Sequence, residues 1–323
     1  MQAVRAIVML VMLVVWAILV PTAASLLAAE AAAPERRASP PDSLSLVFVG
    51  DVMLDNGPGH AIASGRDPFA ACAELLLNAD FTIGNLECVL GRAGKLALKP
   101  YTFRAAADSP RLLKKYFSAV SVANNHSLDF GPEGLIESLR ILDQTGLPHF
   151  GGGKTLADAR RPLILEKDGF KVALLGYNGF QTDRWAAGEA TPGVAALREE
   201  DILADITAAR KQADAVVPFV HWGPELVAQP YEAHRQLAHR MAEAGAAAVI
   251  GGHPHITQTV DLHRGVPIVY SLGNFVFDYY PVDPPTWTGW VVRLTFTTGH
   301  PVELETSTVV LDAAGLPSPV RAE

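Results

Sequence analysis

Short apolar runs alternate with amphipathic segments along most of the chain, and this rhythm limits the folds it can adopt. The runs are rich in β-branched residues and are typical of buried strands. They lie at 44–50, 81–85, 119–124, 171–177, 215–222, 246–252 and 267–275. Because buried strands that alternate with helices form layers, the sequence predicts an α/β fold with a mixed or partly parallel sheet.

Helical periodicity occupies the segments between these strands. It is clearest at 132–146, 198–213 and 231–245, and two of these helices are predicted to end at Gly146 and Gly245. Glycine suits such an end because it adopts the left-handed backbone that closes a helix.

The remaining segments predict one domain with flanking pieces. Alternating strands at 290–298 and 302–311 indicate a closing antiparallel layer. No internal repeat or boundary interrupts 44–312, so we expect a single domain there, with a polar linker at 36–43 and a tail at 313–323.

The beginning of the chain has the composition of an export segment. Arg5 precedes an uncharged apolar run at 6–20, which alanine-rich residues follow. This is the pattern of a cleaved signal peptide, but the uncharged stretch 6–29 is also long enough to span a bilayer. Residues 1–35 are therefore expected to be a signal peptide or a membrane anchor, and either one places the rest outside the cytoplasm, in the periplasm or on the cell membrane.

Charge and cysteine content exclude some classes of function. The net charge is −8 and no basic patch occurs, so we expect no nucleic-acid partner. Cys72 and Cys88 are too few for a disulfide framework or a thiolate metal site. Outside the cytoplasm they form either one disulfide or ordinary packing.

Polar side chains follow six of the predicted strands. They are Asp51, Asp55, Asn85, Glu87, Asn124, Asn125, His126, Asp129, His221, Glu225, His253, His255 and Asn274. Ligand sites of layered α/β folds form at the carboxyl ends of strands, where loops from separate strands meet. We therefore expect these side chains to share one site.

The chemistry of this set favours a divalent metal. Carboxylate, imidazole and amide oxygen together suit Mn²⁺, Fe²⁺ or Zn²⁺, and Glu87 could bridge two ions. The expected ligands are Asp51, Glu87, Asn125, His221, His253 and His255. For each, capping a turn, bracing a loop or packing in the core is the alternative.

The neighbours of these ligands have supporting roles in this interpretation. His126 is either a proton donor or a structural residue. Asp55, Asp129, Glu225 and Asn274 are expected to orient ligands rather than bind metal. The other histidines are interpreted as ordinary surface or core residues: His60, His149, His234, His239, His263 and His300.

Lys99 and Arg104 bracket two aromatic residues in KPYTFRA. Guanidinium binds carboxylate or phosphate through two parallel hydrogen bonds, so this segment is a candidate anion site for substrate. A solvated strand edge is the alternative.

Several of these stretches, in this order, resemble the bacterial capsule-synthesis (CapA, or poly-γ-glutamate synthesis) family. They are GDVMLD, GNLECVL, KPYTFRA, VANNHSLDFG, HFGGG, HWGPE, IGGHPHITQ and YSLGNFVFD, between about residues 46 and 278. The family is similar to calcineurin-like metallophosphoesterases. The resemblance implies a four-layer αββα sandwich and a centre of two metal ions. It also implies that the six expected ligands occupy ligand positions and that His126 occupies the catalytic-histidine position.

The sequence departs from the phosphoesterase pattern in its first motif. That pattern has Asp-x-His, whereas Met53 stands two residues after Asp51, so one imidazole ligand is missing. Glu87 stands at the bridging aspartate position, and Asn124 precedes Asn125 where the pattern has glycine. One metal position is therefore expected to be weak or differently filled.

Three functions are compatible with these features. The first is an exported metal-dependent hydrolase in the biosynthesis of poly-γ-glutamate or a related envelope polymer. The second is a non-catalytic subunit that binds the anionic polymer at a membrane synthase complex. The third is a periplasmic metallophosphoesterase acting on exported nucleotides or phospho-sugars. The intact His126 and His-x-His favour the third function, and the missing imidazole opposes it.

Overall fold

A computed structural model describes residues 36, 43–278 and 283–320. The predicted export segment, 1–35, lies outside the described residues, as do 37–42 of the linker. Within the part that the structure describes, no helix has the length and apolar character needed to cross a membrane.

The first sheet has eight strands, which include the first and the last strands of the described chain. Its order is β16-β15-β14-β1-β2-β3-β4, and β13 pairs with the end of β1. The parallel strands are β1 (Ser43–Val52), β2 (Phe81–Leu86), β3 (Ala119–Ser121), β4 (His149–Phe150) and β13 (Asn274–Val276). The antiparallel strands are β14 (Thr288–Thr297), β15 (Glu303–Leu311) and β16 (Pro317–Pro319).

The second sheet has six strands in the order β11-β12-β10-β9-β7-β6. Its parallel centre consists of β7 (Phe170–Asn178), β9 (Ala215–His221), β10 (Val249–Gly252) and β12 (Val266–Val269). Its antiparallel edges are β6 (Leu163–Lys167) and β11 (Val260–His263). A separate pair joins β5 (Gly152–Gly153) to β8 (Gly193–Val194).

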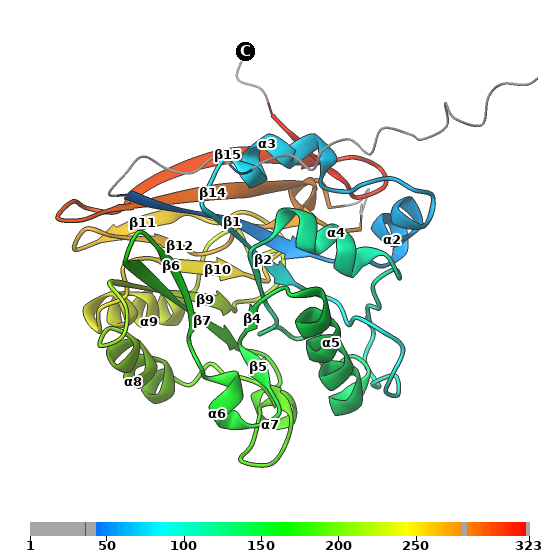
Figure 1. The fold of residues 1–323 in the computed structure, drawn as a ribbon, viewed down its shortest axis with the longest axis horizontal. Helices are drawn as coiled ribbons and strands as arrows, with labels where there is room; N and C mark the ends of the chain where they lie inside the picture. The colour runs from blue at the N-terminus through cyan, green and yellow to red at the C-terminus, as the bar shows by residue number, and fades with distance from the viewer. Residues whose placement is uncertain (1–35, 37–42, 279–282, 321–323) are drawn as a thin grey trace, which may run out of the picture. The chain divides into compact units, whose positions relative to one another are not determined.

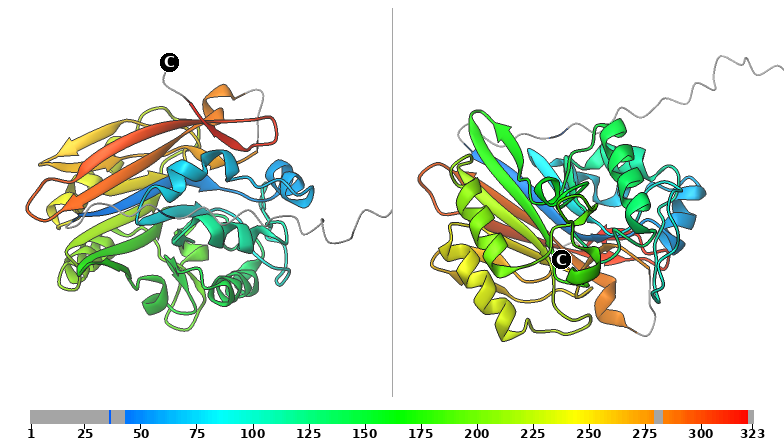
Figure 2. Two further views of the ribbon diagram at one scale, coloured as in Figure 1. Left: turned by 45° about the horizontal axis from the view of Figure 1, so that its top comes forward. Right: turned by 90° about the horizontal axis from the view of Figure 1, so that it is seen from below.

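Helices cover the outer faces of the two sheets (Figures 1 and 2). The described α-helices are α2 (Asn56–Ala63), α3 (Ala73–Leu77), α4 (Ser109–Tyr116), α5 (Gly131–Thr145), α6 (Leu156–Ala159), α7 (Thr182–Trp185), α8 (Glu199–Ala209) and α9 (Glu232–Glu243). Two 3₁₀ turns lie at η1 (Ala70–Cys72) and η2 (Pro284–Trp287). The three predicted helices are confirmed as α5, α8 and α9, and Gly146 and Gly245 follow α5 and α9 with positive φ.

Alternation along the strands divides the core into layers. Leu46 and Phe48 of β1 pack with Val217 and Phe219 of β9 between the two sheets. Val47 and Val49 of β1, and Val216 and Val220 of β9, face the opposite side of their sheets, because successive strand residues point to opposite faces. They join α3, α4 and α5 on the first sheet, and α8 and α9 on the second. The layers therefore run helix, sheet, sheet, helix, which confirms the αββα sandwich with mixed sheets.

One predicted strand is divided into two. The run 267–275 splits into β12 of the second sheet and β13 of the first. Between them Gly273 has φ +69°, where glycine avoids the steric cost that other residues meet. This crossing brings Asn274 beside Asp51, so it helps to build the site described below.

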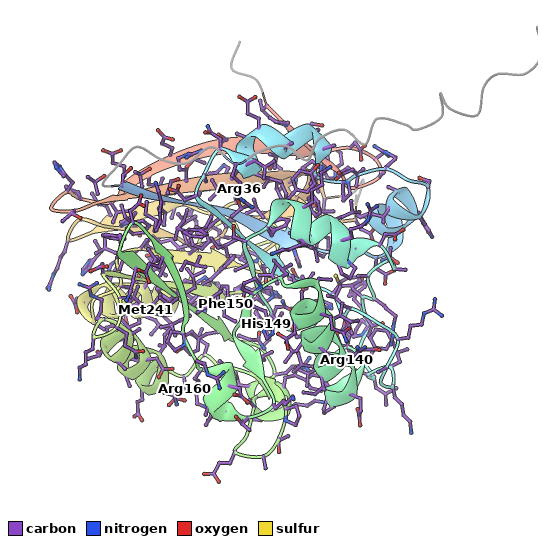
Figure 3. The ribbon with its side chains drawn as sticks, in the orientation of Figure 1. Arg36, Arg140, His149, Phe150, Arg160 and Met241 are labelled. Atoms are coloured by element: carbon purple, nitrogen blue, oxygen red, sulfur yellow. The ribbon has the colours of Figure 1, made fainter. Side chains whose placement is uncertain are left out.

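Both flanking pieces contact the domain. The expected tail contributes β16, and Leu316 is buried. In the expected linker, the Arg36 guanidinium donates hydrogen bonds to the carbonyl oxygens of Leu76 and Tyr116 and to Thr82 (Figure 3).

Cys72 and Cys88 are free and buried, so the disulfide is not formed in the structure. Burial raises the pKa of the Cys72 thiol to about 12 and also raises the pKa of Cys88. Neither belongs to the groups of potential metal ligands among the described residues.

Candidate metal centre

Polar residues converge where strands of the two sheets end. Asp51 lies near the end of β1, Glu87 directly follows β2, His221 ends β9 and His253 directly follows β10. Adjacent parallel pairing aligns the ends of β1 and β2, and likewise those of β9 and β10. The predicted meeting of strand ends is therefore present.

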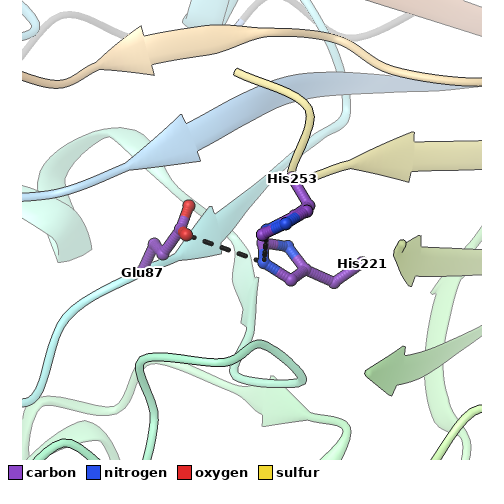
Figure 4. A group of neighbouring side chains, drawn as sticks. All are labelled: Glu87, His221 and His253. Carbon is purple, nitrogen blue, oxygen red and sulfur yellow. Dashed lines mark hydrogen bonds and ion pairs between the residues drawn. The ribbon is translucent and has the colours of Figure 1, made fainter. Parts of the chain in front are cut away.

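The first ligand group surrounds His221. Its Nε2 lies 2.8 Å from Asn125 Oδ1, 3.0 Å from His253 Nδ1 and 3.6 Å from Glu87 Oε1. Figure 4 shows Glu87 facing the imidazoles of His221, at the end of β9, and His253, in the loop after β10. Glu87, His221 and His253 offer donor atoms within 4.8 Å of one another, close enough to hold one ion.

The second ligand group shares Glu87. It consists of Asp51, Glu87 and His255, whose donor atoms also lie within 4.8 Å of one another. His255 Nδ1 is 3.3 Å from Asp51 Oδ2 and 2.9 Å from Asn274 Oδ1. Asn274 therefore contacts the His255 imidazole and restricts its orientation.

Glu87 provides the test of whether a metal fits. Its side chain is 0% exposed, and neither carboxylate oxygen has a hydrogen-bond partner among the described residues. Burial and the neighbouring Asp51 carboxylate raise the pKa of Glu87 well above its usual range. A buried carboxyl without a donor is unfavourable by itself, but as a bridging ligand it would gain the missing partner. The residues present therefore fit a divalent metal.

The three candidate-ligand histidines differ in the direction in which their surroundings shift the pKa. Burial lowers the pKa values of His221 and His253 well below the usual range, so both imidazoles are neutral at physiological pH. For His255, burial opposes the charged form, but hydrogen bonding to Asp51 and the Asp51 charge raise the pKa. In turn, His255 and Asn85 hold the pKa of Asp51 below its usual range against the effect of burial.

Two asparagines form a network behind the ligands, and the sequence did not indicate this role for them. Asn85 Nδ2 donates to Asp51 Oδ1 at 2.8 Å and lies 3.1 Å from His221 Nδ1. Asn124 Nδ2 donates to Asn85 Oδ1, and Asn124 Oδ1 accepts from the backbone N–H of His126. The network thereby joins the end of β1 to the loop that follows β3.

His126 has the surroundings of an oriented imidazole. Its Nδ1 lies 2.8 Å from Asp129 Oδ2, and its Nε2 lies 3.8 Å from Glu87 Oε1. Asp129 also accepts a hydrogen bond from Lys99 Nζ at 2.6 Å. Burial lowers the pKa of His126, and Asp129 partly opposes this shift.

Phenylalanine rings contact all four site histidines, with Phe180 also lying 5.9 Å from His221 between ring centroids. Phe103 lies 4.4 Å from His126, Phe180 lies 3.7 Å from His253, and Phe277 lies 4.6 Å from His255, measured between ring centroids. These contacts restrict the imidazoles. Phe103 was part of the KPYTFRA segment, but nothing in its spacing predicted a partner so distant in sequence.

The His-Pro-His loop has a strained backbone. His253 has φ +95° and His255 has φ +57°, in a region that non-glycine residues rarely adopt. Such strain persists only where the surroundings fix it, and it clusters at functional sites.

Asp55 and Arg104 make contacts that differ from the ones expected of them. Asp55 caps α2 by accepting from Asn56 N, and its other oxygen accepts from Arg104 N, so it braces loops instead of a ligand. The Arg104 guanidinium donates to the carbonyl oxygens of Gly91 and Ala93, and its Cζ atom lies 3.6 Å from the Phe130 ring centroid. It is thus committed within the protein rather than open to an anion.

Lys99, like Arg104, forms hydrogen bonds within the protein. Its ammonium donates to Asp129 and to the Asn125 carbonyl oxygen, and its side chain is 9% exposed. It therefore lies at the site but supports His126 and the Asn125 loop. Of the described residues, the six histidines interpreted as ordinary contribute to none of the ligand groups.

A cavity of about 180 Å³ opens beside the centre. His126, His255 and Asn274 line it together with Tyr101, Phe103, Leu226 and Phe277. Glu225, Asp283 and Thr286 complete its described lining, which contains no lysine or arginine. The cavity is therefore aromatic and acidic.

Comparisons with known proteins find relatives of this chain. A family model described as "Bacterial capsule synthesis protein PGA_cap" matches residues 45–279. The chain is 34% identical over 257 residues to the PGA biosynthesis protein CapA of Bacillus subtilis, covering 78% of this chain and 68% of that protein. It is 30% identical over 252 residues to the capsule biosynthesis protein CapA of Bacillus anthracis, covering 73% of this chain and 60% of that protein.

A solved structure supports the fold. The 5'-nucleotidase precursor from Thermus thermophilus superposes with a TM-score of 0.52 at 14% identity. The match covers 85% of this chain and 56% of the nucleotidase. At this identity the likeness shows a shared metallophosphatase-like fold.

Proposed function

The chain belongs to the bacterial capsule synthesis protein family, and on this premise we propose that it is a metal-dependent hydrolase of envelope-polymer biosynthesis. The proposed substrate is poly-γ-glutamate or a related anionic polymer, because two CapA relatives are named for PGA or capsule biosynthesis. The composition of residues 1–35 supports placing the domain outside the cytoplasm, in the periplasm or anchored to the membrane beside synthase subunits.

The observation that carries the proposal is the buried Glu87 carboxylate. It lacks a hydrogen-bond donor among the described residues and belongs to two ligand groups. Asn125, His221 and His253 would hold one ion with Glu87, and Asp51 and His255 would hold a second. Two ions so bound supply an activated water and stabilise the charge that develops on the substrate.

The residues beside the centre would direct the proton transfers. Asp129 holds His126 through Nδ1, which leaves Nε2 facing the centre. When water adds to a γ-glutamyl amide carbonyl, His126 Nε2 would accept a proton from that water and pass it to the departing nitrogen as the C–N bond breaks. The products are a carboxylic acid and an amine. Phe103 restricts the imidazole during this transfer.

The acidic cavity determines how an anionic polymer could bind. Glu225 and Asp283 repel carboxylates, and no described lining residue is a lysine or arginine. Attraction for poly-γ-glutamate therefore depends on the metal charge. We expect removal of metal by a chelator to abolish polymer binding, which is measurable by equilibrium dialysis.

The experiment that tests catalysis is a turnover screen with His126→Ala. The purified protein would be assayed with γ-glutamyl amides and with phosphodiesters. On the substrate that turns over, we expect the variant to keep its metal and lose about 10²–10⁴-fold in rate, the usual contribution of a general acid.

His149→Ala is the matched control. His149 also pairs with a carboxylate, because its Nε2 lies 3.2 Å from Asp143 Oδ1, but it belongs to neither ligand group. Equal losses in both variants would contradict the role of His126. Metal-dependent polymer binding without turnover of any substrate would instead identify a binding subunit.

A further inference from the structure

Glu225 lies beside the centre, in the loop that follows β9. Its Oε1 is 4.0 Å from His253 Nε2, and its side chain is 56% exposed. Glu225, His253 and His255 offer donor atoms within 4.8 Å of one another. The first and second ligand groups each contain one of these histidines, so the Glu225 carboxylate lies within reach of one ligand of each group.

The backbone around Glu225 is held in a specific conformation. Gly223 has φ +81° and Leu226 has φ +60°, a region in which leucine meets a steric cost. The Leu226 N–H donates to the Pro254 carbonyl oxygen at 3.0 Å, between the two histidines of the neighbouring loop. A strained position that is tied to the His-Pro-His loop suggests that the placement of Glu225 serves the site.

The second ligand group has room for another donor. It contains three side chains, whereas metal ions of the expected kinds bind four or more ligands. Met53, which stands where the phosphoesterase pattern has histidine, accepts a hydrogen bond at its sulfur from Asp55 N at 3.1 Å. The sulfur is thereby used within its own loop.

We propose that Glu225 is a metal ligand, which completes the second group from the solvent side in place of the missing imidazole. This inference rests on the proposed metal centre. It also revises the expectation that Glu225 only orients a ligand. The carboxylate would supply a hard oxygen donor and neutralise part of the charge of the second ion.

Cobalt titration of the full, metal-free chain tests the proposal without an activity assay. Uptake is followed by the visible Co²⁺ spectrum and by mass spectrometry. We expect two equivalents in the wild type. In Glu225→Gln we expect the second equivalent to bind at least about tenfold more weakly, with an altered spectrum, because even outer partners of ligands contribute about 10–100-fold.

Asp283→Asn is the matched control. Asp283 lines the same cavity and carries the same charge, but it belongs to no ligand group found among the described residues. Its titration should therefore match that of the wild type. Equal weakening in both variants, or weakening of only the first equivalent in Glu225→Gln, would overturn the inference. Absence of Co²⁺ uptake by the wild type would overturn the metal centre itself.

Discussion

The two ends of the paired sheets use left-handed backbone for different purposes. At the end remote from the site, Asp168–Gly169 and Arg264–Gly265 close the β6–β7 and β11–β12 hairpins with positive φ. A polar residue followed by glycine is a common solution for such turns. At the site end, His253 and His255 adopt positive φ themselves. At the remote end the positive φ closes a turn. At the site end it is a strained conformation of histidines whose imidazoles are needed at the site.

The size of the cavities does not identify which of the two ends is functional. The remote end has a cavity of about 640 Å³, lined by Lys167, Gly169, Thr297 and neighbouring residues. The cavity at the site end is about 180 Å³. All three potential ligand groups of the described residues nevertheless lie at the site end. The arrangement of buried polar groups, and not volume, marks the functional end.

The largest effect is expected for Glu87→Gln. Because Glu87 belongs to both ligand groups, its loss should lower metal affinity by more than about 100-fold, beyond the usual effect of an outer partner. The metal-free variant should be more stable to urea, since a neutral amide replaces a carboxyl whose ionised form is disfavoured by burial and by Asp51. Metal content and urea unfolding measure both effects. Asp168→Asn at the remote end is the control, and a Glu87→Gln variant that retains both ions would contradict the bridging role.

Substitution of either loop histidine should have a smaller effect, because each belongs to one metal position. His253→Ala and His255→Ala are each expected to lower bound metal while the fold remains largely intact, as measured by metal analysis and circular dichroism. Glycine at the same positions should lose metal equally and be more stable than alanine by about 1 kcal/mol, since it relieves the positive φ. Unchanged metal in both alanine variants would refute a shared site.

At the remote end the expected effect is on stability alone. Gly169 has φ +84°, and an added Cβ would meet no atom within 4 Å. Gly169→Ala should therefore cost about 1 kcal/mol through backbone strain and leave metal binding unchanged. Thermal unfolding with metal analysis checks this. A loss of metal would show that the two ends are coupled.

The smallest effect on metal is expected for Cys72→Ser combined with Cys88→Ser. Both thiols are buried outside the ligand groups, so metal content should not change. Stability should fall because hydroxyl groups replace packed sulfur. Reduced metal in a folded double variant would contradict the assignment of ligands to oxygen and imidazole.

The sequence predicted which candidate ligands come together better than it predicted the contacts of the residues around them. Strand ends can be recognised locally, so the sequence alone could assign Asp51, Glu87, His221 and His253 to one site. The role of Asn85 depends on β1 and β9 lying close together, and no local pattern carries that information. The contacts of Arg104 could not be predicted for the same reason, because its partners follow β2 in a separate loop. Long-range packing therefore decides what the supporting residues do.

The most direct test of the shared centre is a crystal structure of the protein soaked in Mn²⁺, with anomalous scattering recorded to locate the ions. We predict two peaks about 3.5–4 Å apart on either side of the Glu87 carboxylate. One should contact Asn125, His221 and His253, and the other should contact Asp51 and His255. A single peak that Glu87 does not contact, or no peak at these residues, would contradict the two-metal centre.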